Sequence, residues 1–317
     1  MSKTDNVKGY DNSNINWYPG HMAKARKMMQ ENIKLIDVVI EILDARIPFS
    51  SKNPDIDEMA KGKSRVLLLN KADMADPKKT ELWKKYYEEK GFFVNAVNSK
   101  NGAGVKSTSE IIKKACAEKI ERDRRKGILN RPLRAMIAGI PNSGKSTFIN
   151  SYAGKAVAKT GNKPGVTTGK QWIRLSKEVE LLDTPGILWP KFEDRQTGLH
   201  IAFIGSINDD ILFPEEMAYE LITILKREYP GVLDTRYCKK NAEDEVNTCE
   251  KATEEGSKFG EKTTIEDSSD PNEILEMIGK VRGCLKKGGE VDTLKAAKLL
   301  IDDFRNLKLG KITLESF

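Results

Sequence analysis

Short apolar runs alternate with amphipathic stretches along most of the chain. Runs of aliphatic and β-branched residues predict buried strands at 38–43, 65–69, 92–97 and 133–138, followed by a strand pair at 171–175 and 179–182. Helical periodicity before, between and after the strands predicts helices at about 23–36, 79–90, 107–125, 198–206 and 215–229. This alternation is typical of an α/β fold with a mostly parallel sheet and helices on both faces.

The pattern changes beyond residue 238. Positions 239–267 contain almost no large apolar residues, and their polar composition favours a flexible segment. Helical periodicity returns at 271, with Ile274, Leu275 and Ile278 on one face. We therefore expect a flexible N-terminus at 1–14, an α/β domain at 15–235, a flexible polar insertion at 236–270 and a small all-helical domain at 271–317.

A glycine-rich turn follows the strand at 133–138. Residues 139–146 read Gly-Ile-Pro-Asn-Ser-Gly-Lys-Ser, the G-x-x-x-x-G-K-S pattern of a phosphate-binding loop. In such a loop, backbone N–H groups turn onto phosphate oxygens, the lysine neutralises the terminal phosphates and the final hydroxyl ligates Mg²⁺. A chance glycine-rich turn is the alternative, but the strand–loop–helix context argues against it. The predicted phosphate-binding residues are Asn142, Ser143, Gly144, Lys145, Ser146 and Thr147, with Ser146 as a Mg²⁺ ligand.

A second motif follows the strand at 65–69. Asn70, Lys71 and Asp73 form an N-K-x-D pattern, whose carboxylate accepts hydrogen bonds from an edge of guanine that adenine lacks. The lysine stem packs along the base, and the asparagine ties this loop to the phosphate loop. A helix-capping aspartate on an ordinary turn is the alternative. The position at a strand end favours guanine recognition, and the loop with Asn98 and Ser99 supplies a weaker, third base-contacting turn.

Two further segments are typical of a nucleotide switch. Residues 163–169 contain Thr167, and the strand at 179–182 leads into a D-x-x-G motif that begins at Asp183 and ends at Gly186. In such switches, a loop threonine binds Mg²⁺ when the γ-phosphate is present, the aspartate holds a Mg²⁺ water and the glycine N–H meets the γ-phosphate. We therefore expect Thr167, Asp183 and Gly186 to contact the nucleotide, with Thr167 and Asp183 as Mg²⁺ ligands.

Composition adds expectations about location and partners. Of the 317 residues, 38% are hydrophobic and 32% are charged, and no apolar run approaches the ~20 residues of a membrane span. The N-terminus lacks a signal-peptide pattern, and the four cysteines are scattered without a C-x-x-C pair, so we expect reduced thiols and a cytoplasmic location. The net charge of +7 favours a polyanionic partner.

The order of the motifs is unusual, because the guanine motif at Asn70 precedes the phosphate loop at Gly139. Together with the opening Trp-Tyr-Pro-Gly-His-Met at 17–22, this order closely resembles the bacterial ribosome biogenesis GTPase A family. The resemblance covers about 15–237 and 271–314, and the polar insertion departs from it. It implies a circularly permuted P-loop GTPase domain followed by a helical domain. It also implies a GTP-driven factor that binds the large (50S) ribosomal subunit late in assembly.

The resemblance also implies roles for two residues. Many GTPases place a water-orienting glutamine directly after the D-x-x-G glycine, whereas this chain has Ile187. The family's P-G-H-M motif matches His21, which the resemblance makes the catalytic residue in place of that glutamine; a structural histidine is the alternative. The resemblance further extends to potassium-activated GTPases, in which Asn142 would help to hold K⁺ beside the phosphates. The expected cofactors are therefore Mg²⁺ and K⁺.

We expect a GTP hydrolase whose partners are GTP and GDP, the large ribosomal subunit and its 23S rRNA, and which is a monomer away from the ribosome. Basic residues at 122–134 and 282–311 are candidate rRNA contacts, and an ordinary solvated surface is the alternative. Two rival functions use the same motifs: a nucleotide-gated rRNA-binding scaffold in which hydrolysis is incidental, and a membrane-associated GTPase attracted by positive charge.

Overall fold

The computed structural model describes residues 20–129, 131–158, 171–174, 176, 178–183, 187–189, 192, 194–207, 213–238 and 264–317. Thr167, Gly186 and positions 239–263 of the predicted insertion lie outside the described residues. For His21 and Asp183 only the backbone is described.

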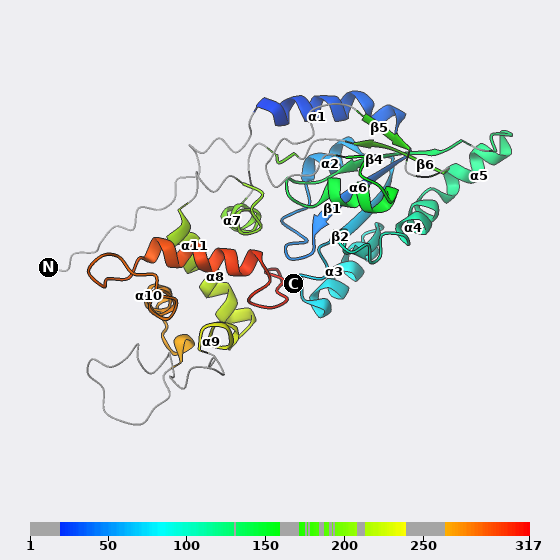
Figure 1. The fold of residues 1–317 in the computed structure, drawn as a ribbon. Helices are drawn as coiled ribbons and strands as arrows, with labels where there is room; N and C mark the ends of the chain where they lie inside the picture. Colours follow the sequence, from blue (N-terminus) through cyan, green and yellow to red (C-terminus); the bar gives the residue numbers. More distant parts are fainter. Residues whose placement is uncertain are drawn as a thin grey trace.

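A six-stranded sheet with the order β3-β2-β1-β4-β6-β5 forms the centre of the larger part of the molecule (Figure 1). Neighbouring strands are parallel, except that β5 pairs with β6 in the antiparallel direction. The mostly parallel sheet confirms the predicted fold class. The strands are β1 (Val38–Asp44), β2 (Ser64–Asn70), β3 (Phe93–Val97), β4 (Leu133–Ala138), β5 (Gln171–Arg174) and β6 (Val179–Asp183).

Helices cover both faces of this sheet, because the two faces of each buried strand are apolar. One face packs against α4 and α6, and the other packs against α1, α3 and α7. The helices of this part are α1 (Gly20–Asn32), α2 (Pro54–Met59), α3 (Pro77–Glu89), α4 (Thr108–Ala115), α5 (Ala117–Arg125), α6 (Lys145–Ala153) and α7 (Arg195–Phe203).

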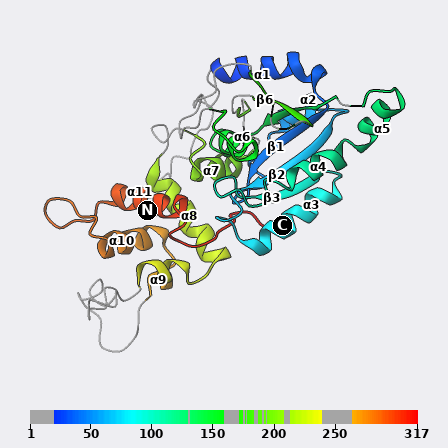
Figure 2. The same cartoon turned by 45° about the vertical axis from the view of Figure 1, so that its right-hand side comes forward.

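The single helix expected at 107–125 is two helices, α4 and α5. The hydroxyl of Ser64 donates a 2.6 Å hydrogen bond to the carbonyl of Ala115, the acceptor that an uninterrupted helix would offer to Lys119. This bond from β2 ends α4, and α5 projects away from the body of the molecule (Figures 1 and 2). Helical periodicity continues across the break, which is why the sequence predicts one helix.

The second part of the molecule is helical. Its elements are α8 (Pro214–Glu228), α9 (Val232–Tyr237), α10 (Pro271–Val281) and α11 (Thr293–Arg305). Helices α8, α10 and α11 pack on one another, and α11 also contacts α7 (Figure 2). One continuous hydrophobic core joins Leu221 and Leu300 of these helices to Ile201 of α7 and Met136 of β4. The helical part therefore packs on the sheet rather than standing apart from it.

The chain does not end in this helical part. After α11, residues 311–317 return to the loops that follow β1 and β2, and Figure 1 shows the C-terminus close to α3. The backbone N–H of Ile312 donates to Met74 O at 3.2 Å, and that of Leu314 donates to Arg46 O at 2.8 Å. Helical periodicity does not predict this extended segment.

The cysteines agree with expectation only in part. Cys116 and Cys284 are free, as predicted, and both are buried. Cys238 is instead disulfide-bonded. Sequence spacing could not reveal this bond, because a disulfide requires closeness in space rather than a particular interval. Among the described residues, no helix combines the length and the apolar character that a membrane crossing requires.

Candidate nucleotide-binding site

The phosphate loop lies at the carboxyl edge of the sheet, between β4 and α6. Two positions of the motif, Gly139 and Gly144, require glycine for two reasons: neighbouring atoms leave no room for a Cβ, and the backbone has a positive φ. A Cβ at Gly139 would lie 2.5 Å from Ile42 O, and a Cβ at Gly144 would lie 2.3 Å from the side-chain nitrogen of Asn70. Gly139 has φ 145° and Gly144 has φ 94°. The loop can therefore approach β1 and the guanine motif only with glycine at both positions.

Lys145 and the start of α6 direct positive charge into this loop. The Lys145 side chain is 8% exposed, and its ammonium group donates a 2.7 Å hydrogen bond to Ile140 O across the loop. The Ser143 hydroxyl donates to the same carbonyl at 2.9 Å. Ser146 and Thr147 follow in the first turn of α6, where backbone N–H groups and the helix dipole favour an anion. This arrangement suits a polyphosphate with a bound cation.

Asn70 connects the guanine motif to the other two loops. Its amide nitrogen donates a 2.7 Å hydrogen bond to Ser143 O in the phosphate loop. Its amide oxygen accepts from the backbone N–H and the hydroxyl of Ser99, at 3.1 Å and 2.7 Å. Because all three residues are buried, these bonds are shielded from water and hold the loops firmly. The expected tie between the guanine motif and the phosphate loop is therefore present, and Ser99 joins it.

Lys71 is held by Asp44, a residue outside the predicted nucleotide-binding set. Its ammonium group lies 2.9 Å from a carboxylate oxygen of Asp44, the last residue of β1. The same carboxylate accepts from Arg46 at 2.9 Å and 2.8 Å. Burial alone would raise the pKa of Asp44, but Arg46 and Lys71 outweigh it and hold the pKa well below its usual range. Burial lowers the pKa of Lys71, and Asp44 opposes that effect.

A signal for Asp44 does exist in the sequence. It ends a buried strand, as Asn70 does, and the two residues are register partners in the parallel pair of β1 and β2. Carboxyl ends of parallel strands meet at one edge, so polar residues at such ends are candidates for a common site. Asp73 lies two residues beyond Lys71 and is partly exposed.

Asn142 is braced by the end of α7. It has a left-handed backbone with φ 57°, and its side-chain nitrogen donates to Gly205 O. The neighbouring Ser206 hydroxyl donates to Pro141 O at 2.6 Å. The guanidinium of Arg305 in α11 donates to the carbonyls of two residues near this end, Ala202 at 2.8 Å and Phe203 at 2.9 Å. Arg305 is therefore a link between the helical part and the phosphate loop, rather than the surface cation expected from the sequence.

The segment after β6 borders the same loop. Strand β6 ends at Asp183 beside β4, and the backbone N–H of Ile187 donates to Gly139 O at 3.3 Å. The Ile187 side chain is fully buried, so it contributes apolar packing where other GTPases carry a water-orienting glutamine. Thr167 and Gly186 cannot be located, because they lie outside the described residues.

The backbone of His21 lies in the first turn of α1. A single 3-10 turn, Ile33–Leu35, separates the end of α1 from the start of β1, so α1 runs antiparallel to β1 (Figure 1). Its first turn therefore lies toward the carboxyl edge of the sheet, as the phosphate loop does. The ion pair between Arg26 and Asp55, at 2.8 Å, holds α1 against the start of α2 at this edge.

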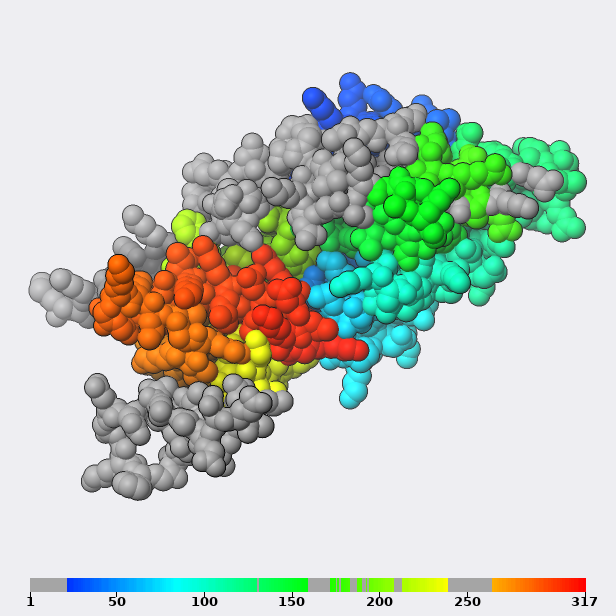
Figure 3. Space-filling view, viewed as in Figure 1, coloured from blue at the N-terminus to red at the C-terminus, as the bar shows by residue number. Residues whose placement is uncertain are grey.

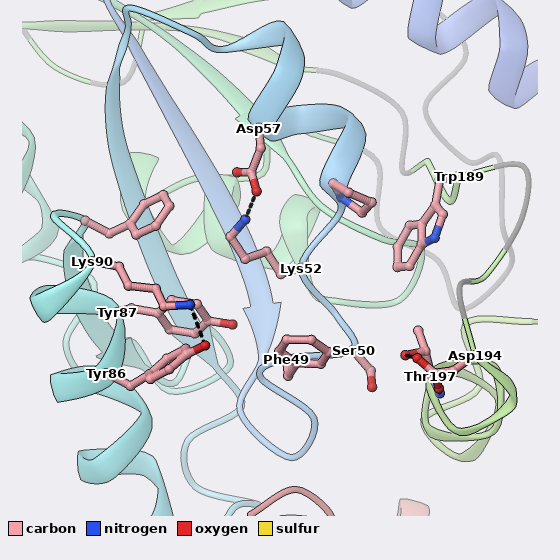
Figure 4. Close-up of a pocket in the computed structure, with 12 residues that line it drawn as sticks. Phe49, Ser50, Lys52, Asp57, Tyr86, Tyr87, Lys90, Trp189, Asp194 and Thr197 are labelled. Atoms are coloured by element: carbon pink, nitrogen blue, oxygen red, sulfur yellow. Dashed lines mark hydrogen bonds and ion pairs between the residues drawn. The ribbon is translucent and has the colours of Figure 1, made fainter. Parts of the chain in front are cut away.

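A separate cleft of about 290 Å³ lies between α3, the loop after β1 and the start of α7 (Figure 4). Its aromatic residues include Phe49, Tyr86, Phe92 and Trp189. Its lysines already have partners, since Lys52 pairs with Asp57 and Lys90 donates to the Tyr86 hydroxyl at 2.6 Å (Figure 4). None of its lining residues belongs to the predicted nucleotide set. In the described part of the chain, no cluster of three or more His, Cys, Asp or Glu side chains is arranged to hold a metal.

Comparison with known proteins agrees with these motifs. A family described as "50S ribosome-binding GTPase" matches residues 134–240. The ribosome biogenesis GTPase A of Bacillus cereus is 45% identical over 302 residues, which are 95% of this chain and 94% of the relative. That of Thermotoga maritima is 30% identical over 301 residues, 95% of this chain and 94% of the relative.

A solved structure agrees as well. The crystal structure of GNP-bound YlqF from T. maritima has a TM-score of 0.61 and 25% identity, and the match covers 92% of this chain and 97% of that one. The similarity to these GTPases thus extends along nearly the whole chain and is not confined to the phosphate loop and its neighbouring strands. The chain is a GTP hydrolase and belongs to the ribosome biogenesis GTPase A family.

Proposed function

We propose that this chain is a circularly permuted GTPase that hydrolyses GTP to GDP and phosphate to drive a late step of large (50S) ribosomal subunit assembly. The observation that best supports a nucleotide site is the set of hydrogen bonds made by Asn70, which join the guanine motif to Ser143 and Ser99. The ribosomal role is supported by the names of the relatives, which are ribosome biogenesis GTPases.

The permuted order of motifs is compatible with one binding site. The guanine motif follows β2 and the phosphate loop follows β4, and β1 lies between these two parallel strands. Both loops therefore emerge at the same edge of the sheet, whichever comes first along the chain. Opening a domain in one loop and joining its ends elsewhere leaves the core unchanged.

Each predicted site residue receives a proposed role. Lys71 and Asp73 contact the guanine base, with Asn70, Asn98 and Ser99 shaping its pocket. The residues from Asn142 to Thr147 contact the phosphates. Ser146, Thr167 and Asp183 hold Mg²⁺, Asn142 holds K⁺, Gly186 meets the γ-phosphate and His21 positions the attacking water. The fit to phosphate and Mg²⁺ is supported by the Lys145 ammonium group, which lies across the loop at Ile140 O, and by the position of Ser146 in the first turn of α6.

Bound cations would neutralise charge that develops on the phosphate oxygens during transfer. The chain's own residues then bind the nucleotide, orient the attacking water and exclude other water from the site. The bond from Asn142 to Gly205 O fixes the orientation of its amide, with the amide oxygen as the remaining acceptor for a cation. The buried Ile187 does not orient water, so that task falls to a residue such as His21, whose helix begins at the same edge.

Contact with rRNA is supported by exposed basic residues of the helical part. Lys286 and Lys287 lie at the tip of the loop between α10 and α11, and Lys295 and Lys298 lie on the exposed side of α11. Arg122 and Arg124 are on the projecting helix α5. These positions are spread over several elements, as expected for contact with a large polyanionic surface. The same proposal includes a cytoplasmic location and a monomeric state away from the ribosome.

Multiple-turnover GTP hydrolysis, measured with and without purified large subunits, tests this function. We expect large subunits to stimulate turnover, and small subunits to serve as the matched control. Co-sedimentation with large subunits should be stronger with a non-hydrolysable GTP analogue than with GDP, and should weaken steeply with salt. Equal co-sedimentation in both nucleotide states, with no stimulation, would favour the nucleotide-gated scaffold instead.

A further inference from the structure

The C-terminal tail, defined here as residues 311–317, fills the junction between the helical part and the guanine motif. Its residues Ile312, Thr313, Leu314 and Glu315 are between 0% and 7% exposed, although they belong to no helix or strand. At the surface, the red end of the chain lies against the cyan residues around α3 (Figure 3). The Phe317 ring lies on the Trp83 ring of α3, with centroids 4.4 Å apart.

The tail forms hydrogen bonds with two loops at once. On the guanine side, Ile312 N donates to Met74 O at 3.2 Å, and Met74 directly follows Asp73. On the other side, Leu314 N donates to Arg46 O at 2.8 Å. Arg46 is the residue that holds the Asp44 carboxylate opposite Lys71. The tail therefore contacts the support of the guanine-reading residues from both directions.

Thr313 is the central contact of this junction. Its fully buried hydroxyl accepts from the backbone N–H of Asp76 at 3.1 Å and donates to Ala45 O at 3.2 Å. Asp76 is the N-cap of α3, so this bond fixes the point at which the guanine loop enters its helix. One side-chain hydroxyl thus joins the loop after β1 to the loop after β2.

The helical part holds the other side of the tail. The Tyr229 hydroxyl at the end of α8 accepts from Thr313 N at 2.9 Å and donates to Thr313 O at 3.0 Å. The carboxylate of Glu315 accepts from the backbone N–H groups of Phe49 and Ser50, and it also lies 2.9 Å from His200 in α7. The tail is consequently placed by α7, α8 and the β1 loop, and not by the guanine loop alone.

We propose that the C-terminal tail is a positioning element of the guanine-binding loop, acting chiefly through the Thr313 hydroxyl. Asp73 must present its carboxylate to the base edge at a defined distance. A loop released from Met74 and Asp76 samples other conformations, and apparent affinity falls with the fraction of molecules that are competent to bind. The inference rests on the proposed guanine role of Asp73.

Two near-isosteric substitutions test the proposal. Thr313→Val keeps the shape and removes the hydroxyl, whereas Thr313→Ser keeps the hydroxyl and removes only the methyl group. Thr223→Val in α8 is the matched control, because the Thr223 hydroxyl is exposed and donates only to Tyr219 O in its own helix. Each protein is titrated with GDP and with IDP, which lacks the exocyclic amine that Asp73 would accept from. The unmutated protein is also titrated with ADP.

We expect Thr313→Val to weaken GDP binding about three- to tenfold, the effect of one or two lost hydrogen bonds. Its preference for GDP over IDP should shrink, and its KM for GTP should rise with kcat nearly unchanged. Thr313→Ser and Thr223→Val should bind as the unmutated protein does. If Thr313→Val fails to fold, Thr313→Ala provides a second variant without the hydroxyl, and the same loss of preference is expected.

Two results would overturn the proposal in distinguishable ways. Equal GDP affinity of the valine and serine variants, or an equal loss for GDP and IDP, would mean that the tail only stabilises the fold. Equal binding of GDP and ADP by the unmutated protein would refute the guanine site itself, and the role of the tail with it.

Discussion

The ammonium nitrogen of Lys71 lies 2.9 Å from the buried carboxylate of Asp44, at the carboxyl ends of two adjacent parallel strands. Asp44 also binds Arg46, which lies over the ring of Phe304 in α11 at 5.5 Å. A residue of the guanine motif is thus connected to the helical part through two charged side chains. We expect disturbance at either end of this chain of contacts to reach the base pocket.

Asp44→Asn should destabilise the fold and weaken nucleotide binding together. The substitution leaves Arg46, which is 3% exposed, and Lys71 without their common anion, and breaking such a buried pair costs about 3–5 kcal/mol. Urea unfolding and GDP titration measure the two effects. Glu58→Gln is the control, because the side chains of Glu58 and its partner Lys61 are each 73% exposed and the loss of this pair should cost about 0–1 kcal/mol. Equal effects of the two substitutions would contradict this role of Asp44.

Asp73→Asn should weaken GTP binding by about 1–3 kcal/mol, the size of a lost charge-assisted contact. Xanthine nucleotides should be spared, because their base edge offers an acceptor where guanine offers an amine. Competition titrations with GTP, XTP and ATP measure the preference. If unmutated protein bound ATP as tightly as GTP, guanine recognition by Asp73 would be wrong.

His21→Ala should keep GTP affinity and lower kcat by about a hundredfold or more, as expected for loss of a group that positions or activates water. Single-turnover hydrolysis in the presence of large subunits is the appropriate measurement. Lys27→Ala, an exposed change in the same helix, should hydrolyse GTP at the unmutated rate. Unchanged turnover in His21→Ala would make His21 a structural residue.

Replacing K⁺ with Na⁺ should slow hydrolysis, and Asn142→Ala should remove the difference between the two salts. The reason is that the Asn142 amide oxygen would lose its role as a K⁺ ligand. Ser206→Ala is the control, since it removes a neighbouring hydrogen bond to Pro141 O without changing the amide. Identical rates of the unmutated protein in both salts would exclude a K⁺ site at Asn142.

Acid should loosen the attachment of the tail through Glu228. Hydrogen bonds from Ser316 and Lys79 lower the pKa of Glu228 from 4.5 to about 2 in the folded protein. Because the folded pKa is depressed, the stabilisation is fully present above pH 4.5 and is lost as the pH falls toward 2. Urea unfolding across this range should show a smaller decline in Glu228→Gln than in the unmutated protein. Matching declines would mean that Glu228 does not contribute.

The amino-acid sequence by itself determined the mostly parallel sheet and the chemistry of its loops. Strand β4 and the phosphate loop were predictable because their signals are local: a buried apolar run, two glycines and a lysine at set spacing. The contact between Asn70 and Ser143 was predictable for a related reason. Parallel strands bring their carboxyl ends to one edge, so the loops that follow them must meet.

Only the tertiary structure decided which residues support these loops. The break between α4 and α5 depends on a hydrogen bond from Ser64, and the brace behind Asn142 depends on Arg305 from the distant α11. Thr313 and Asp76 are separated by 237 positions and still share a hydrogen bond. Periodicity reports that a residue is buried, but not what it is buried against. That choice depends on how the packed elements bring distant polar groups within about 3 Å, where a buried donor must find its acceptor.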